Sequence, residues 1–88
     1  MRKPTYTIYD NVAQIFNWPF AAFNDADAIR SFTQSIEREM MERKNEFSLY
    51  TNGFYDDNTG TWEPSEPTCI FRGSEIGKEE TLKVVNDG

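Results

Sequence analysis

Apolar residues recur at three- and four-residue steps between positions 29 and 40, and this spacing predicts an amphipathic helix. The stripe consists of Ile29, Phe32, Ile36 and Met40. Asn24 is the expected N-cap, with Asp25 as the alternative, and Asp27 gives a short version of the capping box. Because basic residues suit the C-terminal end of a helix dipole, we expect the helix to end at about Arg43.

Two β-rich segments precede this helix. Positions 6–9 and 13–16 are rich in β-branched and aromatic residues, and Asp10-Asn11 between them has turn chemistry. The pattern therefore predicts a β-hairpin. Pro19 ends the pairing of the second strand or places it on a sheet edge, because proline has no amide hydrogen to donate.

A second hairpin is predicted after the helix. Positions 47–55 form its first strand, and Gly53 inside that strand indicates a bulge or a close backbone approach. Positions 56–60 form a turn, and the returning strand starts at positions 61–63. Pro64 and Pro67 then bound a polar kink before a short strand at 69–71.

The element order predicts an α+β fold. Two β-hairpins in ββαββ order form an antiparallel sheet, with one helix packed on a face. The strand residues expected to meet the helix are Tyr6, Ile8, Leu49 and one of Phe16 and Phe20. Residues 1–72 are expected to form a single domain, and residues 73–88 a flexible C-terminal tail.

The charge balance narrows the function classes. Nine basic and fifteen acidic side chains give a formal net charge of −6. Proteins that bind nucleic acid tightly and without specificity need a basic excess to neutralise phosphates, so the balance argues against that class. A local basic patch stays compatible with it.

The amino-acid composition argues against several kinds of site. The chain has no histidine, which removes the commonest general base and most zinc sites, so we expect no enzyme, no metal and no cofactor. Its one cysteine, Cys69, cannot form an internal disulfide, and no signal peptide or membrane-spanning run is visible. We therefore expect a protein of a reducing compartment, without a membrane partner.

Two acidic features and one arginine have ordinary interpretations beside a functional one. The segment 56–60 lacks the glycine and glutamate positions of an EF-hand loop, which favours a hairpin turn. Asp25 and Asp27 could form a catalytic pair, but carboxylates are expected in the first turn of a helix. Arg30 either pairs with Asp27 or with the 56–60 turn, or it contacts a phosphate.

Strand aromatics and scattered cations give a candidate nucleic-acid site. Proteins that bind single strands stack bases on aromatic side chains beside basic residues, and Tyr55 and Trp62 add to the available rings. The candidate DNA-binding residues are Tyr9, Trp18, Arg30, Arg38, Arg43, Lys44, Tyr50 and Arg72.

Four segments in this order resemble one known family. They are Ile8-Tyr9-Asp10, Pro19-Phe20, the nine residues from Asn24 to Phe32, and the stretch from Leu49 to Gly60. Together they resemble the small nonstructural protein of microviruses, especially the gokushovirus branch of small single-stranded DNA phages, over about residues 6–63. The resemblance implies a phage protein made in the host bacterial cytoplasm and absent from the capsid. It also implies association with DNA during single-stranded DNA synthesis or the switch to packaging.

Two functional hypotheses follow. The first is a non-enzymatic phage accessory protein that associates with single-stranded DNA or with the replication complex. The second is an acidic interaction adaptor that acts on the replication initiator or a host protein without touching DNA. An unpaired hairpin edge and a small core also favour a homodimer, through sheet extension or helix packing.

Overall fold

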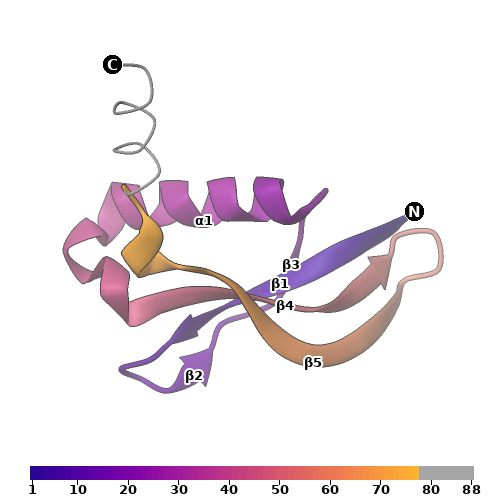
Figure 1. The fold of residues 1–88 in the computed structure, drawn as a ribbon. Helices are drawn as coiled ribbons and strands as arrows, with labels where there is room; N and C mark the ends of the chain where they lie inside the picture. The colour runs from indigo at the N-terminus through magenta and orange to yellow at the C-terminus, as the bar shows by residue number, and fades with distance from the viewer. Residues whose placement is uncertain (78–88) are drawn as a thin grey trace, which may run out of the picture.

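A five-stranded antiparallel sheet carries one long helix across a face (Figure 1). The computed structural model describes residues 1–77. The elements are β1 (Arg2–Asp10), β2 (Ile15–Phe16), β3 (Phe20–Ala21), α1 (Asp25–Glu39), η1 (Met41–Glu46), β4 (Phe47–Asp56), β5 (Thr61–Arg72) and η2 (Gly73–Glu75), where η denotes a 3₁₀ helix. The α+β class is confirmed. The ββαββ order is not, because three strand segments precede α1.

The extra strand arises because one predicted strand is divided in two. Both β2 and β3 pair with β1, through Tyr9 opposite Phe16 and Tyr6 opposite Phe20. Between them, residues 17–19 leave the ladder. Since Pro19 has no amide hydrogen, it cannot continue the pairing, and the segment stays at the sheet edge as two short pieces.

The β4–β5 hairpin contains the predicted bulge at Gly53. The register between these strands shifts from Thr51 to Gly53, and Gly53 adopts a φ of +146°. A Cβ at this position would overlap the carbonyl oxygen of Glu63, so only glycine fits. The predicted kink is instead part of one continuous β5, which tolerates Pro64 and Pro67 because β5 is an edge strand.

The helix begins as predicted and ends earlier. Asn24 is the N-cap, and its side-chain oxygen accepts a hydrogen bond from the Asp27 amide at 2.8 Å. The helix stops at Glu39 instead of Arg43, since Met40 leaves the helical conformation with a φ of −139°. The 3₁₀ segment η1 then carries the chain back into β4.

The core lies between α1 and the sheet face that α1 covers. It consists of Tyr6, Ala28, Phe32, Ile36, Phe47, Leu49, Phe71 and Ile76. The rings of Phe32 and Phe71 meet edge to face at 6.1 Å and join α1 to β5. Of the two alternatives on the second strand, Phe20 packs against this core, whereas Phe16 is 42% exposed.

The packed unit extends beyond the boundary expected from the sequence. Ile76, predicted to lie in the tail, is only 3% exposed and belongs to the core. The Lys44 ammonium donates a hydrogen bond to the Ile76 carbonyl oxygen at 2.8 Å, which fastens η2 to η1. The ordered unit therefore continues past Arg72 at least to Ile76. The rest of the predicted tail, residues 78–88, lies outside the described residues.

Candidate nucleic-acid interface

Within residues 1–77, the sheet face turned away from α1 carries no helix (Figure 1). Side chains alternate between the faces of a strand, and Tyr6 and Ile8 point toward the helix. Thr5, Thr7 and Tyr9 therefore point to the opposite side, which we call the outer face. Any side chain in register with these three shares that face.

Three aromatic rings meet on the outer face. The Tyr9 ring lies 4.6 Å from Phe16 and 6.0 Å from Tyr50, and Phe16 lies 5.2 Å from Tyr50, measured between ring centroids. We call these three residues the ring cluster. Tyr9 and Tyr50 were predicted as DNA-binding residues, and the fold brings them together. Phe16 was expected as a core alternative, yet its register opposite Tyr9 places it in the cluster.

One predicted cation accompanies the ring cluster. Ser48 of β4 is in register with both Tyr9 on β1 and Arg72 on β5, so Arg72 lies on the outer face, with β4 between it and Tyr9. The Arg72 side chain is exposed and forms no ion pair within residues 1–77. A guanidinium there is available to contact a phosphate or to stack on a base.

Two further predicted cations lie on α1, away from the outer face. Arg30 is 70% exposed and pairs with Asp27 at 2.6 Å. Of the two structural partners expected from the sequence, the structure therefore shows Asp27 and not the 56–60 turn. Arg38 forms no ion pair in the part of the chain that the structure describes. Neither residue joins the ring cluster, because α1 covers the other side of the sheet (Figure 1).

The last two predicted cations, both in η1, have structural partners. Arg43 pairs with Glu46 at 3.2 Å, and this hydrogen-bonded carboxylate raises the pKa of Arg43. Lys44 holds the carbonyl oxygen of Ile76. The predicted cations are thus dispersed over the molecule, and Arg72 is the member placed beside the rings.

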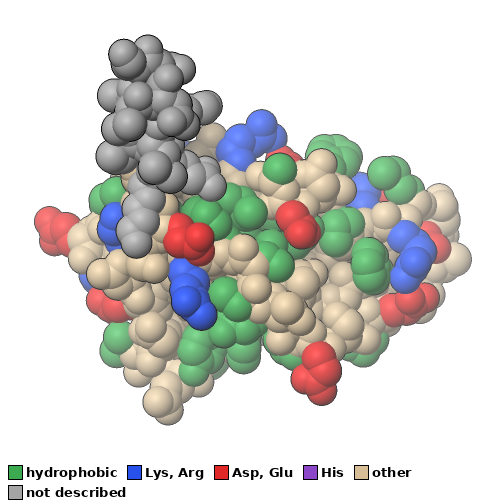
Figure 2. Space-filling view, viewed as in Figure 1, with side chains coloured by type: hydrophobic (Ala, Val, Ile, Leu, Met, Phe, Trp, Pro, Cys, Tyr) green, Lys and Arg blue, Asp and Glu red, His purple; other side chains and the backbone are tan. Residues whose placement is uncertain are grey.

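Charges of both signs alternate over the face shown in Figure 2. Blue and red side chains are interspersed there, and no large basic area is visible. This distribution agrees with the net charge of −6. Binding of a polyanion by this face would have to depend on contacts other than phosphate neutralisation.

Trp18 is the most exposed large hydrophobic side chain within residues 1–77, at 91%. It lies in the link between β2 and β3, directly before Pro19. A ring so exposed contributes little to the core. The sequence predicted Trp18 as a base-stacking aromatic; the structure leaves its ring exposed but outside the ring cluster.

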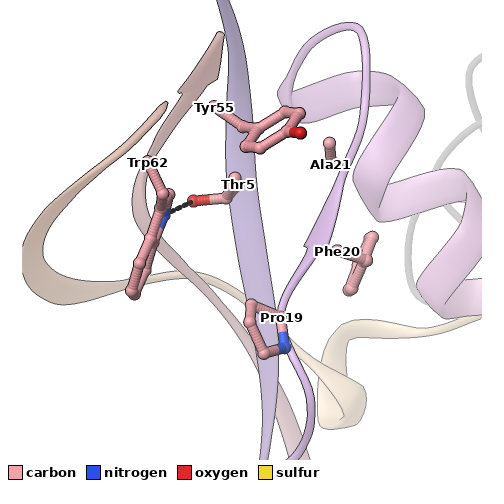
Figure 3. Close-up of a pocket in the computed structure, with 6 residues that line it drawn as sticks. All are labelled: Thr5, Pro19, Phe20, Ala21, Tyr55 and Trp62. Atoms are coloured by element: carbon pink, nitrogen blue, oxygen red, sulfur yellow. Dashed lines mark hydrogen bonds between the residues drawn. The ribbon is translucent and has the colours of Figure 1, made fainter. Parts of the chain in front are cut away.

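A pocket opens on the outer face at the other end of β1 (Figure 3). Tyr55, Trp62 and Pro19 surround Thr5 and Ala21, and the space has a volume of about 380 Å³. Phe20 also lines it, from the side of α1. No local sequence pattern indicates this pocket, because it joins β1, β3 and the distant β4–β5 hairpin.

Hydrogen bonds fix one wall of the pocket. The Trp62 indole nitrogen donates to the Thr5 hydroxyl oxygen at 3.1 Å, and the Thr5 hydroxyl donates to the Asn52 side-chain oxygen at 2.8 Å. Asn52 is the extra residue of the β4 bulge, since Thr51 and Gly53 pair with consecutive residues of β1. The bulge therefore supplies the group that orients the threonine and, through it, the tryptophan.

The carboxylates at the start of α1 have structural partners. The Tyr6 hydroxyl donates to Asp25 at 2.7 Å, and burial together with this hydrogen bond raises the pKa of Tyr6. Asp27 accepts hydrogen bonds from Arg30 and from the Phe23 amide. Within residues 1–77 no three acidic, cysteine or histidine side chains are grouped as metal ligands, and no helix is long and apolar enough to cross a membrane.

Comparison with known proteins gives one match. A comparison with curated proteins and another with solved structures find nothing similar. A family model described as phage ORF5 protein matches residues 3–76. The matched segment includes the outer face, the pocket, α1 and the buried Ile76. The chain belongs to the phage ORF5 protein family.

Proposed function

We propose that this phage accessory protein binds single-stranded DNA by stacking bases on the outer face of its sheet. The observation that carries the proposal is the ring cluster of Tyr9, Phe16 and Tyr50, with Arg72, which forms no ion pair within residues 1–77, on the same face of the sheet. Aromatic side chains next to a cation are the means by which proteins hold single strands without reading sequence. No catalytic step is part of this role.

The resemblance to microvirus nonstructural proteins supplies the setting of the proposal. It implies that the phage has a single-stranded DNA genome and that the protein acts in the host bacterial cytoplasm. It also implies a role in DNA synthesis or in the switch to packaging. A protein that covers unpaired bases suits both stages, because single strands are then exposed.

The expected binding is weak and depends little on salt. Each phosphate neutralised on a single strand contributes about −0.7 to the slope of log K against log salt concentration. With Arg72 as the cation of the described outer face that forms no ion pair within residues 1–77, we expect a slope between about −0.7 and −1.4. Stacking adds about 1–3 kcal/mol per base and does not depend on counterion release.

Anisotropy of a fluorescently labelled oligonucleotide tests the proposal. Phe16→Ala should weaken binding about 5- to 150-fold, which corresponds to one lost stacking contact. Phe54→Ala is the matched control, because Phe54 is also 42% exposed but alternates to the other face, where its ring lies 4.5 Å from the Arg2 guanidinium. Absence of binding for every sequence at low salt would refute direct DNA contact.

The acidic adaptor is a second candidate, and it is favoured by the dispersal of the cations. If it is correct, the ring cluster contacts the replication initiator or a host protein, and capture of that partner survives nuclease treatment and is lost in Phe16→Ala. Strand addition is a less suitable mode, because Pro64 and Pro67 interrupt one sheet edge and Pro19 divides the other. A homodimer stays a prediction, to be measured by light scattering.

A further inference from the structure

The ring cluster and the pocket lie at opposite ends of β1 on one face of the sheet. Tyr9 belongs to the cluster, and Thr5 forms part of the pocket. We propose that the pocket between Tyr55, Trp62 and Pro19 holds one unstacked base of the strand bound by the ring cluster. This inference rests on the proposed function and assigns it a second contact site.

The lining of the pocket fits a nucleobase. None of its residues is charged, and Tyr55, Trp62 and Pro19 provide apolar ring surfaces around Thr5 and Ala21 (Figure 3). A base has two apolar faces and polar edges, so its rings can contact these surfaces while its edges remain in water. The volume of about 380 Å³ accommodates a planar group of that kind.

The tryptophan is held in place before any ligand arrives. Its indole nitrogen is bound to the Thr5 hydroxyl, which is itself bound to Asn52, and its side chain is 45% exposed. An immobilised ring loses little conformational entropy on binding, and this favours affinity.

A cation lies next to the pocket for the backbone of the strand. Lys3 is in register with Tyr55 and pairs with Asp57 at 3.4 Å. Its side chain is 30% exposed, so a phosphate that approaches the pocket can replace or join this carboxylate. Lys3 at one end and Arg72 at the other thus border the aromatic contacts.

The separation of the two sites sets a minimum length of strand. Thr5 and Tyr9 are four residue steps apart along β1, which is about 13 Å at ~3.3 Å per residue. This equals about four nucleotide steps at ~3.4 Å each. A strand that fills both sites therefore needs about five nucleotides.

Tryptophan fluorescence tests the inference separately from the proposed function. The chain has two tryptophans, so Trp18→Phe leaves Trp62 as the sole fluorescent indole. In this background an eight-nucleotide oligothymidylate should quench Trp62 over the same concentrations at which its anisotropy rises. Within the same background, Trp62→Ala should weaken binding about 5- to 150-fold.

A second variant keeps the test decisive if Trp62→Ala does not fold. Tyr55→Ala removes the opposite wall, and the Tyr55 side chain makes no hydrogen bond within residues 1–77, so its loss should weaken binding without unfolding the protein. A rise in anisotropy without Trp62 quenching, and with unchanged affinity in Tyr55→Ala, would overturn the pocket while leaving the proposed function intact. No rise in anisotropy at low salt would overturn both.

Discussion

Phe32→Ala tests whether the helix packs on the sheet through the face described above. The Phe32 side chain is 1% exposed, and its ring meets that of Phe71 edge to face at 6.1 Å. Replacing a buried phenylalanine by alanine costs about 3–5 kcal/mol, because apolar burial is lost and a cavity remains. The edge-to-face contact accounts for about 0.5–1.5 kcal/mol of such an effect.

This loss is large compared with the stability available. A domain of 88 residues has a free energy of unfolding of about 4–13 kcal/mol, at ~0.05–0.15 kcal/mol per residue. Phe32→Ala should therefore lose a large share of the free energy of unfolding, and it unfolds at room temperature if the unmodified protein lies near the lower limit of this range. Urea denaturation followed by far-UV circular dichroism measures the difference.

Phe23→Ala is the matched control for this experiment. Phe23 is 70% exposed, and its main contact is the Lys3 ammonium, 5.7 Å from the ring centroid. Its loss should cost less than about 1 kcal/mol. The free energy of unfolding of Phe32→Ala could instead lie within about 1 kcal/mol of that of the unmodified protein, which is the effect expected of the control. That result would mean that a different face of α1 contacts the sheet.

Three further predictions concern single contacts. Gly60→Ala should lower the free energy of unfolding in urea by about 1–2 kcal/mol, since Gly60 has a φ of +73° and open space around it. Gly53→Ala should lower it clearly more, because the backbone of β5 must move to make room for the added Cβ. Equal losses in the two variants would contradict the bulge geometry. Arg30→Ala should change stability by less than about 0.5 kcal/mol, because its ion pair is exposed, and a larger loss of melting temperature would indicate a buried role. Tyr6→Phe should lower stability at pH 8 by about 1.5–3 kcal/mol through loss of the hydrogen bond to Asp25. Because the folded pKa of Tyr6 is raised above 10.0, its contribution is complete below pH 10.0 and is lost at higher pH, so the melting temperature of Tyr6→Phe should fall less steeply there.

The parts of the fold that sequence predicted are those determined by neighbouring residues. Asn24 caps the helix three positions before the amide it binds, and Phe32 and Ile36 repeat at helical spacing. Gly53 was identifiable as a bulge because glycine is unfavourable within a regular strand. The end of the helix was missed, because the return of the chain to β4 decides it and local propensity favours continuation through Arg43.

The candidate site was predictable only in part for the same reason. Alternation and aromatic content identified Tyr9 and Tyr50, but their approach to Phe16 depends on the register across three strands. The Thr5–Trp62 hydrogen bond joins residues 57 positions apart, and no local pattern reports it. For one of the dispersed cations, the sequence does indicate a structural partner. Arg43 and Glu46 are three positions apart, a spacing that allows an ion pair within one helical turn.

The acidic charge and the ring cluster together favour single strands over duplexes in the proposed function. Duplex DNA carries about one charge per 1.7 Å of axis, twice the density of one of its strands, so a protein of charge −6 is repelled more strongly by the duplex. Stacking on Tyr9, Phe16 and Tyr50 requires unpaired bases, which a duplex does not offer. A basic protein with the same rings would bind both forms through their phosphates. On the proposed function, we therefore expect the acidic surface to lower the affinity for DNA in general and to raise the preference for single strands, whose bases can stack on the rings.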